Sequence, residues 1–337
     1  MDQARGILAK AVTADAPGAA RGCDSVPWLS RYRFGDHGEY EVIQADELDE
    51  RLRAWRLVYR SYAAKGYAQP SADELWYGLH DALPATRIFL VTRDGRDVAT
   101  LSLVFDSPLR LPADEVYGDE LNKLRVQDRR ACEMVSLVSE ETTSARCLEV
   151  LKHLFKLAYL TATRLEGATD MVITVHPHHA AYYERRLLFE AVGGVRDYGK
   201  VGGAPAVLLR LDLQTAEARY EERYGDGAGG LFRFFIDPET EPDVVAFLGR
   251  RGAGLSRSDL ATWFERERPL LSQVSAAIRE YLRGLYRETD ESRVRHDRPW
   301  HWARSTPAFG DERRTARQGE QFGCCSSGTL LPELLAQ

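Results

Sequence analysis

Glu133 is the residue of this sequence whose surroundings first suggest chemistry. It lies in the run Cys132-Glu-Met-Val, inside a segment that is mostly apolar over residues 132–139. A carboxylate is costly to bury unless it is paired or used. Two interpretations therefore stay open. Glu133 acts as a general base or binds a cationic amine, or it pairs structurally with one of the many arginines.

A second group of reactive side chains follows the apolar segment 170–175. It begins His176-Pro177-His178-His179 and continues to Tyr182 and Tyr183. His-x-His spacing can bind zinc or copper, but no nearby carboxylate or cysteine completes a ligand set, so we expect no metal. A histidine that hydrogen-bonds backbone or substrate is the favoured interpretation. Tyr183 follows at the start of the next predicted helix, where packing is its ordinary role.

The elements around these residues alternate between strands and helices. Residues 87–92 and 98–105 predict a hairpin, because Asp94-Gly95 between them is a strong turn signal. Segments 132–139 and 170–175 are apolar enough to be inner strands, and 207–213 closes the sheet. Helices are predicted at 145–165 and 180–188 from their apolar periodicity. This order predicts an α/β fold, a mixed twisted sheet whose central strand pair is parallel.

Further helices are expected on both sides of this core. Before the hairpin they are 47–65, which ends at Gly66, and 71–83, which Pro84 stops; 112–125 follows the hairpin. After residue 213 we expect helices at 243–250, 258–266 and 269–286. We therefore divide the chain into a mobile tail (1–30), a core domain (31–213), a helical C-terminal extension (214–290) and a loosely ordered tail (291–337).

Composition limits the possible classes. The chain has 337 residues, 44% of them hydrophobic, and a formal charge of −6, so nothing attracts it globally to nucleic acid or anionic membrane. No apolar run reaches the roughly 18–20 residues of a membrane span, and the N-terminus lacks a secretory signal. The five cysteines have no zinc spacing and favour a reduced, cytoplasmic setting. P-loop, dinucleotide and serine-hydrolase motifs are absent.

Five motifs in order resemble one family. They read ATLSLVFDS (99–107), LPADEVYGDEL (111–121), CEMVSLV (132–138), VHPHHAAYYERRLLFEAVGG (175–194) and GAPAVLL (203–209). Over about residues 48–213 the chain is similar to the long-chain N-acyl amino acid synthases. These belong to the GCN5-related N-acyltransferase superfamily and are related to bacterial autoinducer synthases. The resemblance implies that fold and an enzyme that joins a long acyl chain to an amino acid or similar amine.

The resemblance also implies the donor. Acetyl-CoA enzymes of the superfamily carry a glycine-rich loop that binds pyrophosphate after the central strand. Residues 139–146 here read SEETTSAR, without glycine. The acyl-amino-acid group lacks that loop as well, because acyl carrier protein offers a phosphopantetheine arm and no pyrophosphate. We therefore expect acyl carrier protein as donor and partner, and no separate cofactor.

Site residues follow from the same resemblance. Glu133 is the candidate base, Tyr183 the candidate acid for the departing sulfur, and His179 matches the family's histidine, although its Asn-Pro-Arg-His motif is His-Pro-His-His here. The superfamily places a strand N–H near the substrate carbonyl. The residues expected to bind substrate are Val135, Ser136, Leu137 and Val138, and a tail pocket could be lined by Tyr59, Tyr62, Leu101, Leu103 and Phe105. The alternative for these aromatic and aliphatic side chains is ordinary core packing.

Arg146, Lys152 and Lys156 are expected to dock the acidic carrier protein, unless they form an ordinary solvated helix face. Two other functions remain open. One is an enzyme of the same fold with another acceptor, either an autoinducer synthase or an acyltransferase attached to a protein-export system. The other is a non-catalytic module that binds acyl carrier protein or lipid.

Overall fold

The computed structural model describes residues 31–225, 231–236 and 241–292. The predicted tail 1–30 lies outside these ranges, as does the predicted tail 291–337 after residue 292. The strands are β1 (Tyr32–Phe34), β2 (Tyr40–Gln44), β3 (Arg87–Arg93), β4 (Arg96–Phe105), β5 (Ala131–Ser139), β6 (Asp170–Val175), β7 (Glu190–Ala191), β8 (Arg196–Tyr198) and β9 (Ala204–Asp212).

The helices follow in the same chain order. They are α2 (Leu48–Ala64), η2 (Leu79–Ala82), α3 (Asp114–Val126), α4 (Ser144–Leu160), η3 (Thr161–Leu165), α5 (Pro177–Leu187), η4 (Gly199–Val201), α6 (Leu213–Tyr224), α7 (Leu231–Phe235), α8 (Glu241–Gly249), α9 (Arg257–Ala261), η5 (Thr262–Glu267), η6 (Leu270–Gln273) and α10 (Ala276–Ser292).

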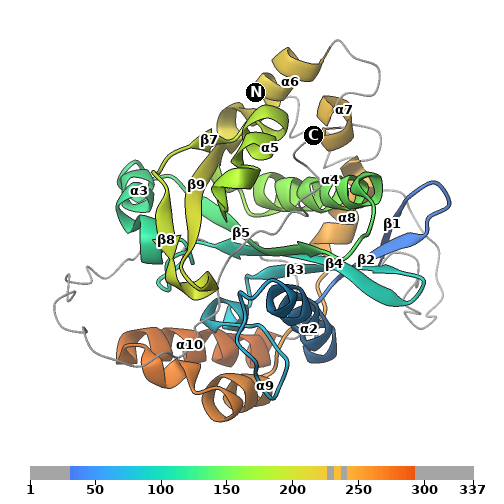
Figure 1. Cartoon of the computed structure of the whole chain (residues 1–337). Coiled ribbons are helices and arrows are strands. Elements are labelled where there is room, and N and C mark those ends of the chain that lie inside the picture. The colour runs from blue at the N-terminus through green and yellow to red at the C-terminus, as the bar shows by residue number, and fades with distance from the viewer. Residues whose placement is uncertain (1–30, 226–230, 237–240, 293–337) are drawn as a thin grey trace, which may run out of the picture.

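In the described ranges the strands form one twisted sheet in the order β1-β2-β3-β4-β5-β6-β9-β7, with β8 paired to β9 (Figure 1). Neighbouring strands run antiparallel except β5 and β6, which are parallel. A parallel pair needs a long crossover, and α4 with η3 supplies it. The predicted α/β fold with a parallel central pair is confirmed.

Helices cover both faces of the sheet. Side chains of α4, α5, α6, α7 and α8 share one apolar core with one face of the strands. Side chains of α2, α3, α9 and α10 pack against the other face (Figure 1). The predicted C-terminal helices are therefore present, and they divide over the two faces: α6 to α8 on one, α9 and α10 on the other.

Most of the predicted elements are confirmed. The hairpin β3–β4 turns at Asp94 and Gly95, which both have positive φ (51° and 74°), as a tight two-residue turn requires. The two predicted inner strands match β5 and β6, and the predicted long helix matches α4 with η3. The elements β1, β2 and α6 were not predicted from the sequence.

The helix predicted for residues 71–83 is wrong except for its last turn, η2. Glu74 has a φ of +50°, which no right-handed helix allows. The Asp73 carboxylate instead receives a hydrogen bond from the Leu75 N–H at 3.2 Å and pairs with Arg268 at 2.8 Å. A contact with a distant segment, which periodicity cannot reveal, holds this stretch as an extended loop.

Candidate active site

The parallel strands β5 and β6 pair only over a short length. Their register runs from Ala131 opposite Asp170 to Met134 opposite Ile173, and beyond this point β5 continues alone to Ser139. In the same stretch the pairing of β5 with β4 shifts between Thr100 and Ser102, and Ser136 has a φ of +52°. This β-bulge turns the backbone of residues 135–138 out of the regular ladder. The two strands therefore part beside a segment that can offer unpaired N–H groups.

Glu133 lies at the closed end of this opening, opposite Val172 of β6. Its side chain is fully buried. One carboxylate oxygen accepts the Ala113 N–H at 2.8 Å, and the other lies 3.5 Å from the Thr174 hydroxyl, which donates to it. The partners found are therefore a backbone amide before α3 and a hydroxyl of β6.

Tyr183 comes from α5, which begins at Pro177 with His176 as its N-cap. Its ring is fully buried, with centroids 5.8 Å from Phe155 and 5.9 Å from Phe189. Its hydroxyl has no hydrogen-bond partner among the described residues. Burial raises the pKa of Tyr183 well above its usual value, while the pKa of the less buried Tyr182 rises to about 12. The phenol is thus an available donor, but a weak acid.

The histidines form the first turn of α5. The Nδ1 atom of His176 accepts the His178 N–H at 3.2 Å, which caps the helix. Burial, together with the charges of His178, His176 and Lys65, lowers the pKa of His179 to about 4. His179 is therefore neutral at physiological pH. Within the described ranges, no cluster of three or more His, Cys, Asp or Glu side chains could hold a metal ion.

The loop after β5 leads into α4, whose N-cap is Thr143. Within this loop the Glu141 side chain is buried. It accepts a hydrogen bond from Tyr40 at 3.1 Å and pairs with Arg93 at 2.7 Å. A buried acidic group thus stands at the position where a pyrophosphate loop would offer N–H groups.

A hollow of about 370 Å³ lies between the end of α2 and the end of β5. Its lining residues are Arg60, Ser61, Ala64, Lys65, Val138, Ser139 and Glu140. Arg60 and Glu140 join across it through two hydrogen bonds of 2.9 and 3.1 Å. The sequence marked only Val138 of this set, because the others carry no pattern distinguishable from a solvated helix end. Thr174 was also missed, although it is a polar residue in a buried strand.

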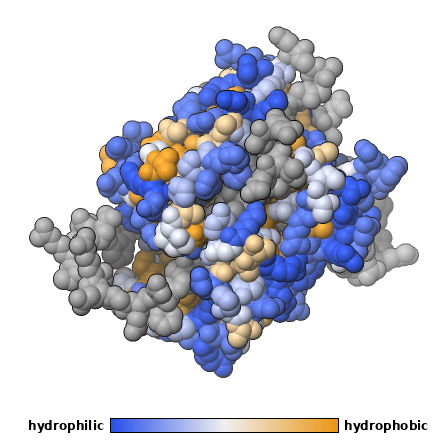
Figure 2. Space-filling view, viewed as in Figure 1, coloured by the Kyte–Doolittle hydropathy of each residue, from blue (hydrophilic) through white to orange (hydrophobic). Residues whose placement is uncertain are grey.

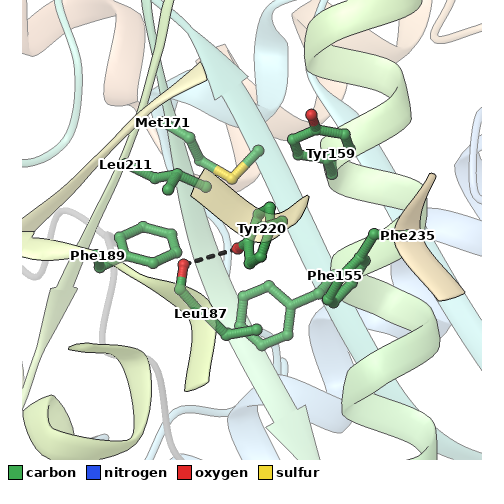
Figure 3. A pocket seen from close by; sticks show the side chains of 8 residues that line it. All are labelled: Phe155, Tyr159, Met171, Leu187, Phe189, Leu211, Tyr220 and Phe235. Atoms are coloured by element: carbon green, nitrogen blue, oxygen red, sulfur yellow. Dashed lines mark hydrogen bonds between the residues drawn. The ribbon is translucent and has the colours of Figure 1, made fainter. Parts of the chain in front are cut away.

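A second void lies inside the core between α4, α5, α6 and α7 (Figure 3). It is enclosed by Phe155, Tyr159, Met171, Leu187, Phe189, Leu211, Tyr220 and Phe235. The Tyr220 hydroxyl donates to the Leu187 carbonyl at 2.7 Å, the bond drawn in Figure 3. At about 10 Å³ this void holds one water molecule at most, so as it stands it is core packing and not an acyl site.

The five residues predicted to line a tail pocket do not come together. Leu101, Leu103 and Phe105 of β4 pack in the core shared with α4. Tyr62 and Tyr59 belong to the core under α2, on the opposite face of the sheet. Successive strand residues face opposite sides of a sheet, and the aromatic residues of α2 cannot reach the α4 side. The grouping of these five residues into one pocket is therefore wrong.

The predicted docking face is also wrong in part. Lys156 is only 4% exposed, and its ammonium group lies 5.0 Å from the centre of the Phe234 ring of α7. Lys152 lies 4.4 Å from the same ring and pairs with Glu149 at 2.7 Å. Helix α7 covers this part of α4, which sequence periodicity could not foresee. Arg146 is exposed and the Lys152 side chain is 29% exposed, so Lys156 is the residue of the three that a partner cannot reach.

The described helices offer no stretch long and apolar enough to cross a bilayer. The face drawn in Figure 2 is largely hydrophilic, with small scattered hydrophobic areas. Such a distribution is normal for the surface of a globular protein.

Known proteins resemble this chain over the region that builds the site described above. The model of the family described as "N-acyl amino acid synthase FeeM" matches residues 53–212. A search of curated proteins finds no match to the chain.

Three solved structures illustrate the similarity. FeeM from uncultured soil microbes is 23% identical, with a TM-score of 0.46; the match covers 53% of this chain and 93% of FeeM. An N-acetyltransferase from Staphylococcus aureus Mu50 is 13% identical, with a TM-score of 0.37, over 52% of this chain and 98% of its own. The AHL synthase LasI is 16% identical, also with a TM-score of 0.37, over 52% of this chain and 92% of its own.

The family match covers the elements that build the opening between β5 and β6, from α2 to β9. The resemblance seen in the motifs is thereby confirmed, and the chain is an N-acyltransferase. Over residues 53–212, just under half of its length, the chain is similar to the N-acyl amino acid synthases.

Proposed function

We propose that this enzyme transfers a long fatty acyl group from acyl carrier protein to the amino group of an amino acid or a similar amine. The observation that carries the proposal is the parting of β5 and β6 after Met134 and Ile173, beside the bulge at Ser136. An extended phosphopantetheine arm fits such a gap, because its amides can bond to strand backbone freed from the ladder. An N–H of residues 135–138 would then bind the thioester oxygen.

The loop after β5 supports a carrier-bound donor. The buried Glu141 carboxylate and the lack of glycine make this loop a poor site for the diphosphate of coenzyme A. A carrier protein brings no diphosphate to that place. Two basic side chains are exposed nearby: Lys65 at the end of α2 and Arg146 at the start of α4. Their positive charge suits an acidic partner. No cofactor beyond the donor's own arm is needed for the reaction.

The chemistry is an aminolysis of a thioester. The neutral amine nitrogen attacks the carbonyl carbon, the carbonyl oxygen becomes an oxyanion, and the carbon–sulfur bond then breaks. The amine loses a proton to a base and the thiolate gains one. In this proposal Glu133 takes the first proton, directly or through Thr174 and water, and Tyr183 gives the second.

The test compares donors with purified enzyme and a mixture of amino acids. Long-chain acyl carrier protein should be consumed far faster than acetyl-CoA, with the acylated amino acid identified by mass spectrometry. Robust acetyl-CoA turnover without turnover of the acyl carrier substrate would overturn the donor assignment. Lipid extracts of an expressing bacterial host extend the test to the acceptor. Acyl lactones there would indicate an autoinducer synthase, and no new lipid would favour a non-catalytic binding module.

A further inference from the structure

The loop between β5 and α4 holds a buried ion pair that the proposed reaction steps do not use. The Glu141 side chain is fully buried, and its carboxylate accepts the Tyr40 hydroxyl at 3.1 Å and pairs with Arg93 at 2.7 Å. The Arg93 guanidinium also donates to the Tyr40 hydroxyl at 3.2 Å, and the Arg93 side chain is 25% exposed. Tyr40 and Arg93 lie directly opposite each other on β2 and β3. Two neighbouring strands therefore fix the carboxylate of this loop.

The opening between β5 and β6 is closed at one end. The strands are paired up to Met134 and Ile173, so an extended donor arm cannot pass there. At the other end β5 finishes at Ser139, and the loop with Glu141 leads from it to α4. An arm bound along residues 135–138 therefore carries its phosphate end past this loop.

Three N–H groups of this loop and of the first turn of α4 already have acceptors. The Glu140 N–H donates to a β4 carbonyl at 2.8 Å, and the Glu141 N–H donates to the Ser139 hydroxyl at 3.3 Å. The Arg146 N–H donates to the Thr143 hydroxyl at 3.4 Å. The start of a helix binds phosphate through N–H groups that have no other acceptor. A diphosphate would have to compete for these donors, and it would also meet the Glu141 carboxylate.

Arg93 is a cation with the geometry to bind phosphate at this place, because a guanidinium forms paired hydrogen bonds with phosphate oxygens. The Glu141 carboxylate neutralises it, and it does so in a buried position, where charges interact more strongly than in water. Asp94 also lies 3.9 Å from Arg93, but its side chain is 86% exposed, so this second pair is weak. Glu141 is therefore the residue that keeps Arg93 from binding a phosphate.

We propose that Glu141 selects the donor by rejecting the diphosphate of coenzyme A, and that Arg93 becomes a phosphate-binding residue when this carboxylate is removed. A carrier-bound arm ends in a single phosphodiester that continues into the carrier protein. Coenzyme A brings a diphosphate and a further phosphate on its ribose, so the repulsion falls mainly on coenzyme A. The inference rests on the proposed function, because it concerns the donor of the same reaction. The family match begins at residue 53, so Tyr40, which holds the carboxylate, lies outside it.

The experiment compares three donors that carry the same hexadecanoyl chain, with the amino acid mixture as acceptor. The chain is attached to acyl carrier protein, to coenzyme A or to pantetheine, which has no phosphate. Glu141→Gln keeps the shape of the side chain and removes its charge. We expect kcat/KM for the coenzyme A donor to rise about 10–100-fold in this variant, through a lower KM, and kcat/KM for the pantetheine donor to change by less than about twofold. Adding Arg93→Met to Glu141→Gln should abolish the gain, because the phosphate-binding cation is then missing.

Asp94→Asn is the matched control. It removes a carboxylate beside the same arginine, but from an exposed position, and asparagine tolerates the positive φ of 51° at this residue. Its preference among the three donors should stay within about threefold of the wild type. Circular dichroism verifies the folding of each variant. The wild type supplies a second measurement that needs no substitution: free coenzyme A should inhibit the reaction of the carrier-bound donor at least about tenfold more weakly than free phosphopantetheine.

The outcomes separate this inference from the proposed donor. A wild type that prefers the carrier-bound donor, with the same preference in folded Glu141→Gln, would overturn the inference and leave the proposed donor intact. Equal inhibition of the wild type by coenzyme A and phosphopantetheine would overturn it as well. No turnover of the carrier-bound donor by the wild type, together with a gain of coenzyme A use in Glu141→Gln, would refute the proposed donor and support the role of Glu141.

Discussion

Glu133 and Tyr183 are two polar side chains that the structure buries completely, with opposite consequences. The Glu133 carboxylate has hydrogen-bond donors for both oxygens, from Ala113 and Thr174. The Tyr183 hydroxyl has none among the described residues. A carboxylate whose oxygens are hydrogen-bonded can be purely structural, whereas a buried hydroxyl without a hydrogen-bond partner lowers the free energy of unfolding. The roles of both residues stay predictions that single substitutions can test.

Glu133→Gln removes the charge and keeps the shape of the side chain. If Glu133 takes the amine proton, kcat/KM should fall by roughly 10²–10⁴, with the loss shrinking at high pH, where the amine deprotonates itself. Steady-state kinetics across pH, with circular dichroism to verify folding, makes the measurement. A folded variant with wild-type activity at neutral pH would show that Glu133 has only a structural role, in holding the start of α3.

Tyr183→Phe removes only the hydroxyl. Because the hydroxyl has no described partner, the variant should be at least as stable as the wild type. If the phenol protonates the leaving thiolate, kcat should fall by about 10–10³ with little change in KM. Tyr182→Phe is the control and should be nearly silent. Equal losses from both variants would show that the acid is elsewhere.

At the scale of elements, we expect the contact between β1 and α4 to depend on pH. His153 of α4 stacks on Phe34 with ring centroids 3.9 Å apart. Its Nδ1 lies 2.8 Å from the Tyr32 hydroxyl and its Nε2 lies 3.0 Å from Glu149. A neutral ring satisfies both contacts, with Nε2 donating to Glu149 and Nδ1 accepting from Tyr32. Burial lowers the pKa of His153 to about 4, although Glu149 acts in the opposite direction.

Stability should therefore fall as the pH drops from about 6.5 to about 4. In that window the unfolded chain takes up a proton on this histidine, whose ordinary pKa is about 6.5, and the folded protein does not. Burial also lowers the pKa values of His80 and His179 to about 4, so they add to the loss. We expect each of these histidines to lower the free energy of unfolding in urea by up to about 2 kcal/mol from pH 7 to pH 5. His153→Gln should show a smaller decrease, and an unchanged pH dependence in that variant would exclude His153 as a source.

At the scale of the whole molecule, the C-terminal helices complete the core under α2 and α3. Phe264 of η5 is fully buried, with its ring 5.4 Å from Tyr77 and 6.3 Å from Trp55, which belongs to α2. The Tyr286 hydroxyl of α10 donates to the Ala82 carbonyl at 2.7 Å. Segments beyond the family match thus close the face of the sheet that carries Glu133.

Phe264→Ala should reduce the free energy of unfolding by about 3–5 kcal/mol, because it leaves a cavity among aromatic rings. Val126→Ala is the control, since Val126 is 88% exposed and its truncation should change stability by less than about 0.5 kcal/mol. Urea denaturation of both variants makes the comparison. A Phe264→Ala protein as stable as the wild type would mean that the C-terminal helices fold without supporting the core.

Sequence alone determined the local elements of this protein and its resemblance to one family. Asp94-Gly95 specified the β3–β4 turn through its backbone preferences, and apolar runs specified β5 and β6 as inner strands. These features depend on neighbours in the chain, so they can be read without coordinates. The motif order from residue 99 to residue 209 likewise needed only the sequence.

Tertiary structure alone decided which side chains share a space. Periodicity shows that Leu101 and Tyr62 are buried, but only strand pairing shows that they lie on opposite faces of the sheet. Lys156 looked solvated until α7, about 75 residues later in the chain, was found over it. The partners of Glu133 and of Glu141 were hidden for the same reason. Each depends on contacts between distant segments, and these form only when the sheet orders the strands.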